Sequence, residues 1–458
     1  MSSRMTCAGC GWTAPPLDPR PFRCPRAGMD DVDHVLARRL ESASPVPFFD
    51  LEPNPFLRYR TFTHAWHTAQ AIGVSDSEFV DLVRALDARL GGFVITPFEQ
   101  RDGFWVKDET HNVAGSHKSR HLMGLMLWLL VAERIDSSLG QARLAIASCG
   151  NAALAAATIA QAAQRELDVY VPDDASPSVI LGLQALGANV TRCMREPGVA
   201  GDPAYLRFRQ AVARGALPFT CQGNENGLVI EGGQTLGWEL ASQLAARGTT
   251  LDHLFIQVGG GALASATIAA LEEAEGLDVL PRMPRIHAVQ TLASPLRRAY
   301  DLVLERGMDE AIAHRSQFMW PWETAPHSIA TGILDDETYD WAAVLRGVLS
   351  TGGSVITVSE DELREANRMA GDGVSATGSA GLAGALAVQY ADESVGVLLT
   401  GTSITAPLSV TSERPEALAL PIDRPPFKTR ARDLGARADL DFDNIEELLD
   451  QIDGPFRK

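Results

Sequence analysis

Segments with the apolar pattern of β-strands alternate with helix-patterned segments along most of this 458-residue chain. The strand-like "GFWVKDE" precedes the helical "HLMGLMLWLLVAERI", and the short apolar run "RLAIAS" precedes the Ala-rich "AALAAATIAQAAQR". The same order continues through "HLFIQVGGG", "ALASATIAALEEA" and "VGVLLTGTS". Because strands that alternate with helices usually join into parallel sheets, the pattern predicts an α/β fold with helices on both sheet faces.

The two ends of the chain lack this alternation. Residues 1–56 are rich in Pro, Arg and Cys, which predicts a small N-terminal extension before a body that begins near Leu57. Residues 411–458 become Pro/Arg-rich and then acidic, which predicts a surface tail with one short amphipathic helix.

Charge and composition argue against several classes of function. The formal net charge is −18 and the pI is about 5.0, a field that repels nucleic acid and anionic membranes, and no Lys/Arg block offsets it. No stretch approaches the roughly 18 consecutive apolar residues that a membrane helix needs, and the N-terminus has no signal-peptide pattern. The six cysteines are too few for a disulfide framework and suit a reduced compartment. We therefore expect a cytoplasmic protein that acts on a small molecule.

The stretch "HNVAGSHKSRH", residues 111–121, places Lys118 where a small polar turn enters the long apolar helix. The helix dipole and a low dielectric both favour the neutral amine, which can form a Schiff base with an aldehyde. A solvated or snorkelling lysine is the commoner role for such a residue. Lys118 is therefore a candidate nucleophile, with a surface lysine as the alternative.

Three further turns each follow a strand-like segment. "ASCGNAALAAA" predicts free donors around Ser148 and Asn151, although either residue could simply cap the helix. "VGGGALAS", which begins one residue before Gly259, predicts an anion cradle for phosphate, although a tight turn can need glycine for steric reasons alone. "VLLTGTSI" brings the Thr400 hydroxyl to the same sheet edge, where it could bond a ring nitrogen or cap the next turn.

In this order the motifs resemble those of the fold-type II pyridoxal-phosphate enzymes, which include threonine synthase, threonine and serine dehydratases, cysteine synthase and the tryptophan synthase β subunit. "VKDETHNVAGSHKSR" resembles the family's K-x-E…N-P-T-G-S-F-K-D-R run, "SCGNAALA" its S-S-G-N-T-A motif, and "VGGGALAS" its glycine loop. "EGGQTLGWEL", "IHAVQ", "GVSATGSAGLAGA" and "LLTGTS" also have counterparts, so the resemblance spans about residues 57–405.

The resemblance implies two open, twisted, mostly parallel α/β domains with the cofactor in the cleft between them. Residues 57–140 and 225–410 would form the large cofactor-binding domain, and residues 141–224 the small one. A homodimer is also implied.

The resemblance also implies a role for each motif residue. Lys118 would be the Schiff-base lysine for pyridoxal 5'-phosphate, Asn151 would bond the phenolic oxygen, and Thr400 would face the pyridine nitrogen. Backbone amides would hold the cofactor phosphate at Gly259, Gly260, Gly261 and Ala262. The substrate carboxylate would bind at Ser148, Cys149, Gly150 and Ala152. A hydroxyl at the ring nitrogen makes the ring a weaker electron sink than a carboxylate would, which suits elimination and replacement at Cβ or Cγ.

Two cysteine motifs in the N-terminal extension, "CAGC" and "CPRAG", resemble the cysteine ribbon that opens many threonine synthases and ends in C-P-x-C. Ala27 stands at the last position, so only Cys7, Cys10 and Cys24 remain. Three cysteines do not close a structural zinc site without another ligand. We expect a degenerate ribbon without metal, and His34 is the nearest possible substitute ligand.

The chain departs from the family pattern at Val113, Ala114, His117, Ser119, Ala376 and Thr377. We expect His117 to be a packed or surface histidine, because a helical neighbour of Lys118 points away from it. Arg120 and Lys107 lie close enough in sequence to be candidates for a substrate-phosphate subsite.

The expected activity is that of a pyridoxal-phosphate-dependent lyase acting on a small amino acid. It would resemble threonine synthase, with a γ-phosphate substrate, or a threonine or serine dehydratase, with simple β-elimination. In either version Lys118 removes the α-proton as general base. The alternative is a cofactor-binding protein that has lost turnover and serves as a partner or regulatory subunit, suggested by the altered residues around Lys118.

Overall fold

The computed structural model describes residues 3–403, except 42, 196–197, 200, 323–325 and 389–392. All of the described residues belong to one compact unit of the chain. The predicted tail at residues 411–458, with its short helix, lies outside the described residues.

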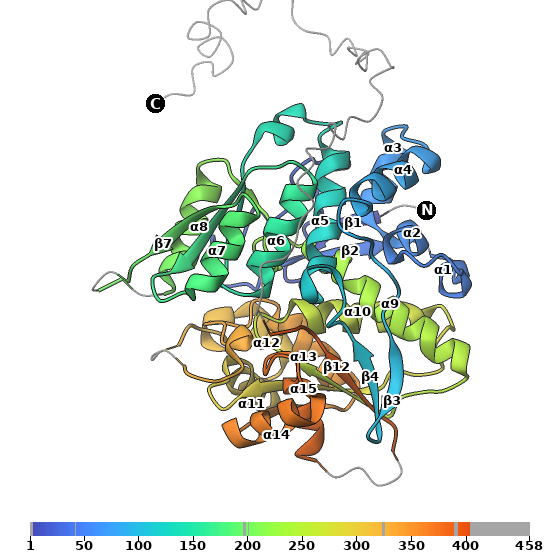
Figure 1. Cartoon of the computed structure of the whole chain (residues 1–458), viewed down its shortest axis with the longest axis vertical. Coiled ribbons are helices and arrows are strands. Elements are labelled where there is room, and N and C mark those ends of the chain that lie inside the picture. The colour runs from blue at the N-terminus through green and yellow to red at the C-terminus, as the bar shows by residue number, and fades with distance from the viewer. Residues whose placement is uncertain are drawn as a thin grey trace, which may run out of the picture. The chain divides into compact units, whose positions relative to one another are not determined.

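A six-stranded sheet forms the larger of the two α/β layers (Figure 1). Its strand order is β11-β10-β9-β12-β4-β3, and every pairing is parallel except that of the edge strand β3 with β4. The strands are β3 (Phe98–Arg101), β4 (Phe104–Asp108), β9 (His253–Gln257), β10 (Arg285–Thr291), β11 (Ser354–Val358) and β12 (Val395–Leu399). The inner strands β9 and β12 are buried along their whole length, as expected for strands covered on both faces.

A second sheet has four strands in the order β7-β6-β5-β8, all parallel. These are β5 (Leu144–Ala147), β6 (Leu167–Pro172), β7 (Asn189–Cys193) and β8 (Leu217–Pro218), with helices α6 (Asn151–Ala162), α7 (Pro177–Ala185) and α8 (Pro203–Ala213) between them in sequence. The prediction of two mostly parallel α/β sheets is therefore confirmed. The strands fall inside the ranges predicted for the two domains, while the boundaries themselves stay a prediction.

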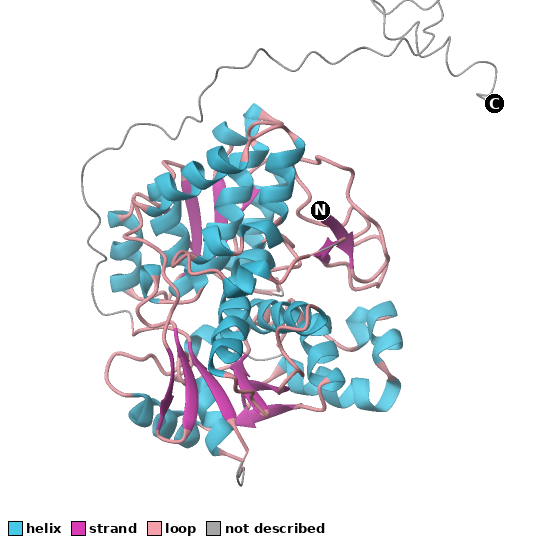
Figure 2. Ribbon diagram, turned by 90° about the vertical axis from the view of Figure 1, so that its right-hand side faces the viewer, coloured by secondary structure: helices cyan, strands magenta, loops and turns pink. Residues whose placement is uncertain are grey.

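The long helix α9 (Val229–Arg247) packs against two others, α5 (Lys118–Ala132) and α10 (Ala262–Gly276). Figure 2 shows helices flanking the strands of the sheets. Every residue of α5 after Lys118 is buried, which explains why this helix is apolar on more than one face. Helices α5 and α9 approach closely at Gly124 and Gly232, since a Cβ on Gly124 would lie only 2.6 Å from the Gly232 Cα. Small residues at this crossing fix the position of the Lys118 end of α5.

The remaining helices contact strands of the six-stranded sheet, the long helices α5, α9 and α10, or one another. They are α1 (Val46–Phe49), α2 (Pro55–Arg58), α3 (His64–Ala71), α4 (Asp76–Asp87), α11 (Pro295–Arg306), α12 (Met308–Ala313), α13 (Trp341–Ser350), α14 (Glu360–Ala370) and α15 (Ala380–Leu386). Short 3-10 turns occur at η1 (Arg60–Phe62), η2 (Val113–Gly115), η3 (Ser137–Gln141), η4 (Arg315–Gln317) and η5 (Thr331–Ile333). Helices α4 and α14 begin with a Ser/Glu capping box.

The N-terminal extension contains an antiparallel pair of strands, β1 (Ser3–Cys7) and β2 (Leu36–Leu40). Most of the intervening residues form irregular turns. Within the part of the chain that the structure describes, no helix combines the length and the apolar character needed to cross a membrane.

Candidate functional site

The turn that carries Lys118 is joined to the end of strand β12. Ser116 and Gly401 form an isolated antiparallel bridge, and the His117 N–H donates to the Thr400 carbonyl oxygen at 3.0 Å. The Thr402 N–H donates to the Gly115 carbonyl oxygen at 2.9 Å. Two of the predicted motifs, 283 residues apart in sequence, are therefore in direct contact.

Asn151 reaches the same place from the second sheet. It is the first residue of α6, and a Cβ on Gly401 would lie 2.8 Å from its Nδ2 and 2.9 Å from the Ser116 Cβ. The preceding turn is held by the Gly150 N–H, which donates to Ser148 Oγ at 3.3 Å. Cys149 at the tip of this turn is exposed, so the turn is open to a ligand from solvent.

The glycine turn follows β9, which is the neighbour of β12 in the sheet. Gly261 adopts a φ of 97°, a left-handed conformation that favours glycine, and helix α10 begins at the next residue. A Cβ on Gly259 would collide with the Asp335 carboxylate, and the Gly260 N–H is hydrogen-bonded to that carboxylate. The turn thus presents an N–H group to an anionic oxygen.

The Thr400 hydroxyl is fixed by Gln257, the last residue of β9. Gln257 Nε2 donates to Thr400 Oγ1 at 2.7 Å and to the carbonyl oxygens of Gly378 at 2.8 Å and Leu398 at 3.2 Å. Because those carbonyls can only accept, the amide nitrogen must face them, and Thr400 Oγ1 therefore accepts from Gln257. The Thr400 hydroxyl proton is left free for a second acceptor.

Lys118 differs from Lys107, the other lysine within the described residues. There are four lysines, Lys107, Lys118, Lys428 and Lys458, and the last two lie outside the described residues. Lys107 is fully buried and paired with Glu239, whereas Lys118 is half-buried and forms no hydrogen bond or ion pair within the described ranges. Its amine is therefore available at the meeting point of the turns.

The positive charge of Lys118 acts on two aspartates near the glycine turn. Burial raises the pKa of Asp335 to about 6, and the positive charge of Lys118 opposes that rise. Burial likewise raises the pKa of Asp340 to about 7, where the Gly223 N–H and Lys118 act in the opposite direction. The Asp340 N–H donates to the Gly260 carbonyl oxygen at 2.9 Å, so the Asp340 backbone contacts the glycine turn, while its carboxylate accepts from the Gly223 N–H at 3.3 Å.

Arg120 and Lys107 do not line an anion subsite. Both side chains are fully buried, and Arg120 pairs with Glu109 at 2.7 Å and with Glu239 at 2.5 Å. Lys107 Nζ lies 2.7 Å from Glu239 Oε2 and 2.9 Å from the Thr96 carbonyl oxygen. Their charges are compensated inside the protein beneath the turn.

His117 is packed, as the sequence predicted. It is buried, its Nδ1 lies 3.1 Å from the Thr400 carbonyl oxygen, and its ring meets that of His121 edge-on. Burial, with the charge of Lys118 acting in the same direction, holds the pKa of His117 well below its usual value. A histidine that stays neutral across the physiological range serves packing rather than proton transfer here.

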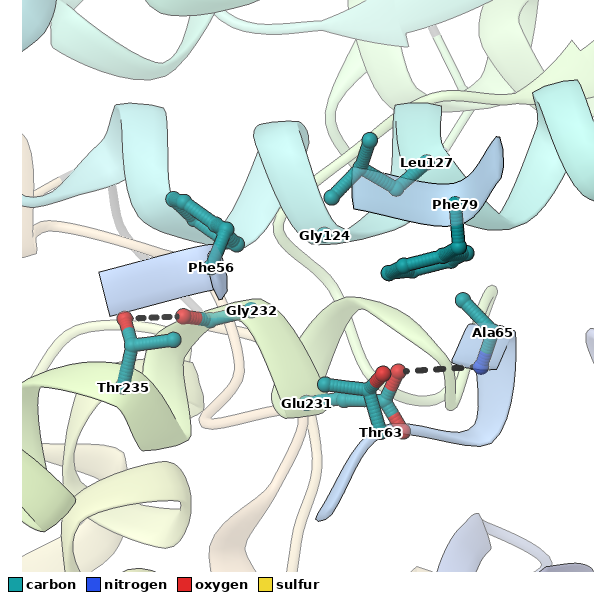
Figure 3. A pocket seen from close by; sticks show the side chains of 9 residues that line it. All are labelled: Phe56, Thr63, Ala65, Phe79, Gly124, Leu127, Glu231, Gly232 and Thr235. Carbon is teal, nitrogen blue, oxygen red and sulfur yellow. Dashed lines mark hydrogen bonds between the residues drawn. The ribbon is translucent and has the colours of Figure 1, made fainter. Parts of the chain in front are cut away.

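A separate pocket lies between α5, α9 and the N-terminal helices and contains none of the predicted site residues (Figure 3). The Glu231 carboxylate in it accepts hydrogen bonds from the backbone N–H groups of His64 and Ala65, where α3 begins. Burial raises the pKa of Glu231 to about 7. The pocket is lined by Phe56, Thr63, Ala65, Phe79, Gly124, Leu127, Glu231, Gly232 and Thr235.

Three residues near the site were missed in the sequence: Gln257, Asp335 and Asp340. Gln257 could have been noticed as a polar residue ending an otherwise apolar strand directly before the glycines. The two aspartates stand in the acidic run "LDDETYD", whose contact with the glycine turn no local pattern reveals.

Comparison with known proteins supplies a family assignment for this geometry. A family model described as "Pyridoxal-phosphate dependent enzyme" matches residues 93–401. L-serine dehydratase of Saccharomyces cerevisiae (strain RM11-1a) is 28% identical over 214 residues, which cover 44% of this chain and 61% of the yeast protein's length. Phenylserine dehydratase of Ralstonia pickettii is 27% identical over 324 residues, covering 68% of this chain and 86% of that protein. Among solved structures, the threonine deaminase of T.th. shares the fold, with a TM-score of 0.51, 21% identity, and coverage of 70% of this chain and 97% of that chain.

Proposed function

Because this chain belongs to the pyridoxal-phosphate dependent enzyme family, we propose that it is an ammonia-lyase that eliminates a β-substituent from a small amino acid. The observation that carries the proposal is the meeting of Lys118, Asn151 and Thr400 beside the glycine turn at the carboxyl ends of neighbouring strands. The curated relatives that are named dehydratases support β-elimination as the reaction type.

The residues at the site fit pyridoxal 5'-phosphate. An amine without a partner among the described residues, an N–H group that already binds an anionic oxygen, and a hydroxyl with a free proton match the aldehyde, the phosphate and the ring nitrogen of that cofactor. The Ser116 hydroxyl is buried at the same turn without a hydrogen-bond partner among the described residues. Unsatisfied buried hydroxyls are uncommon in proteins, so this one supports a polar ligand beside it.

Each contact to the cofactor follows from this fit. Lys118 Nζ would hold the aldehyde carbon, Asn151 Nδ2 would donate to the phenolic oxygen, and Thr400 Oγ1 would donate to the ring nitrogen. Backbone N–H groups would hold the phosphate at Gly259, Gly260, Gly261 and Ala262. When bound, pyridoxal 5'-phosphate supplies an electron-withdrawing ring that stabilises negative charge at the substrate Cα.

Lys118 would also move the protons of the reaction. Its free amine would remove the proton from Cα and could return a proton to the departing β-substituent. Thr400 would donate one neutral hydrogen bond to the ring nitrogen and carries no negative charge, so it would not hold that nitrogen protonated. A modest electron sink favours loss of a nearby leaving group over transamination.

A β-hydroxy amino acid is the substrate class that the site supports best. The open turn at Ser148, Cys149, Gly150 and Ala152 would bind its carboxylate through backbone N–H groups. A γ-phosphate substrate would need an additional cationic subsite, and Arg120 and Lys107 are already paired with carboxylates. Threonine synthase activity is therefore less well supported than serine or threonine dehydration.

A substrate panel on the purified, cofactor-loaded chain tests the proposal. We expect ammonia and a 2-oxo acid from L-serine, L-threonine or phenylserine, and no phosphate release from O-phosphohomoserine. Phosphate release without oxo-acid formation would instead support the synthase alternative.

Lys118→Ala separates the enzyme from a silent cofactor-binding partner. The variant should lose the violet absorption of the bound cofactor and the activity, with the far-UV circular dichroism unchanged. A wild-type protein that shows the violet band but exchanges no α-proton of any small amino acid would identify a protein that has lost turnover.

We further propose a homodimer in the cytoplasm. The dimer is supported by exposed apolar side chains: Val46, Phe49 and Leu51 are 66%, 65% and 91% exposed, and Val94 is 57% exposed. Sedimentation of wild type and Phe49→Asp should show a dimer and a weakened dimer, respectively. A monomeric wild-type protein would contradict the proposed dimer.

A further inference from the structure

Three cysteines and one histidine of the N-terminal extension converge on a single point. Cys7 ends strand β1, Cys10 lies in the turn after it, Cys24 belongs to the following loop, and His34 precedes β2. One ligand atom from each residue lies within 4.8 Å of the other three. We propose that Cys7, Cys10, Cys24 and His34 bind a structural zinc ion.

The spacing of these atoms suits a tetrahedral metal. At a Zn–S distance of about 2.3 Å, two sulfur ligands of a tetrahedron lie about 3.8 Å apart, and a sulfur and a nitrogen ligand about 3.6 Å. Cys10 Sγ and Cys24 Sγ are separated by 3.8 Å, and Cys7 Sγ and His34 Nδ1 by 3.4 Å. The two measured edges therefore correspond to those of a zinc site.

The backbone around the thiols has the form of two metal-binding turns. The N–H groups of Gly9 and Cys10 are hydrogen-bonded to Cys7 Sγ, and the Arg26 N–H is hydrogen-bonded to Cys24 Sγ. Gly11 adopts a φ of 72°, which lets the chain reverse after the second cysteine. Such N–H donors stabilise sulfur ligands that carry negative charge.

His34 is oriented by a carboxylate. Its Nε2 lies 2.8 Å from Asp30 Oδ1, which assigns the ring proton to Nε2 and leaves the Nδ1 lone pair facing Cys7. A carboxylate that holds the outer nitrogen of a metal-binding histidine is a recurring feature of zinc sites. The sequence favoured a ribbon without metal because a fourth cysteine is missing, and the structure brings His34 to that place.

Zinc fits this ligand set better than other common metals. Three thiolates and one imidazole in a tetrahedron select zinc over magnesium or calcium, which prefer oxygen ligands. With four protein ligands no coordination position remains open for substrate, so the ion would be structural. Cys7, Cys24 and His34 are buried, as expected for a structural ion shielded from solvent.

A chain of contacts would link the zinc site to the glycine turn of the candidate functional site. Asp33, the neighbour of His34, is buried, and its carboxylate accepts from Trp341 Nε1 at 3.2 Å and pairs with Arg315. Trp341 directly follows Asp340, whose N–H donates to the Gly260 carbonyl oxygen at 2.9 Å. Loss of the ion should therefore weaken cofactor binding in addition to loosening the ribbon.

Metal analysis of the full-length chain tests the proposal. Wild-type protein, dialysed under reducing conditions against metal-free buffer, should contain one zinc ion per chain by mass spectrometry. Cys193→Ser, which removes a buried thiol outside the cluster, should keep that content, whereas Cys24→Ala and His34→Ala should lose it. Asp30→Asn should retain the site with about 10- to 100-fold weaker affinity.

A measurement on the wild type keeps the proposal testable if the variants do not fold. Exchange of the metal for Co²⁺ should produce the visible absorption of a tetrahedral cobalt–thiolate site, at longer wavelength than the cofactor band. X-ray absorption of the zinc form should show three sulfur ligands at about 2.3 Å and one nitrogen at about 2.0 Å. A wild-type protein without zinc or cobalt binding, a disulfide between Cys10 and Cys24, or full zinc affinity in His34→Ala would overturn the proposal.

Discussion

Two regions built from one short stretch of chain, residues 107–120, treat their positive charges in opposite ways. Beneath the turn, Lys107 and Arg120 are fully buried and share the carboxylates of Glu109 and Glu239. On the turn, Lys118 is half-buried and has no partner within the described part of the chain. The same segment therefore supplies both a buried ionic network, formed by Lys107, Arg120 and their carboxylate partners, and a reactive amine.

Hydrogen bonds connect the buried ionic network to the turn that carries Lys118. Asn112 Nδ2 donates to Glu109 Oε2 at 2.7 Å, and Glu109 is bound by Arg120 on the helix that begins at Lys118. Burial tends to raise the pKa of Glu109, but the charge of Arg120 and its hydrogen bonds outweigh burial and hold that pKa at about 2. The ionised network therefore persists at neutral pH and fixes the base of the turn.

The largest effect is expected from breaking the buried ionic network, in which Glu239 pairs with Lys107 and Arg120. Glu239→Gln leaves Lys107 and Arg120 with one buried carboxylate between them, and the free energy of unfolding should fall by about 3–5 kcal/mol. Chemical denaturation followed by circular dichroism measures this change. Asp301→Asn, which removes an exposed ion pair with Arg297, is the matched control and should change stability by less than about 0.5 kcal/mol. Equal losses of unfolding free energy in the two variants would show that the buried ionic network contributes no more stability than an exposed ion pair.

The second-largest effect is expected from removing the Thr400 hydroxyl. Thr400→Val removes the hydrogen bond to the ring nitrogen, and kcat should fall about a hundredfold, as for the loss of one preorganised donor. Thr400→Ser should restore most of the activity, because the hydroxyl remains within reach of Gln257. Steady-state rates with the preferred β-hydroxy amino acid provide the measurement. Full activity in Thr400→Val would remove Thr400 from the site.

A smaller, pH-dependent effect is expected at Asp335. Burial raises the pKa of its carboxyl to about 6, so the group is largely neutral below that pH and charged above it. The charged form occupies the Gly260 N–H and repels phosphate, so cofactor affinity should fall as the pH rises through about 6, by up to about tenfold per pH unit.

Asp335→Asn should remove this competition. The ratio of wild-type to variant dissociation constants, measured by cofactor titration from pH 5.5 to 8, should grow above pH 6 and approach a constant below it. Taking the ratio cancels the titration of the cofactor phosphate itself. A ratio that is independent of pH would mean that Asp335 does not compete for the glycine turn.

The smallest effect is expected at Ser116. Since its buried hydroxyl has no partner among the described residues, Ser116→Ala should leave the free energy of unfolding within about 0.5 kcal/mol of wild type. Cofactor affinity should fall severalfold if this hydroxyl contacts the ligand. A stability loss without any change in affinity would assign it to packing alone.

Sequence patterns predicted the fold because they are local. The period of the apolar residues identifies a strand or a helix within a few turns of chain, and the strand-end turns at Lys118, Asn151 and Thr400 followed from that alternation. The order of those turns carried the family resemblance, which the match of residues 93–401 confirms.

Contacts between distant segments could not be predicted in this way. Lys107 and Glu239 are 132 residues apart, and Gln257 and Thr400 are 143 residues apart, so no local pattern couples them. Lys107 therefore looked like a free cation near the site, and Gln257 was overlooked. His34 follows Cys24 outside the usual cysteine spacing, and only the fold of the ribbon brings the two together.

Because the chain has only four lysines, one measurement decides whether Lys118 holds the cofactor. The purified, cofactor-loaded chain is reduced with borohydride to fix the cofactor on its lysine, digested, and mapped by mass spectrometry. We expect the modification on Lys118 and on none of Lys107, Lys428 and Lys458. Modification of another lysine, or no modification of a protein that has bound the cofactor, would contradict this expectation.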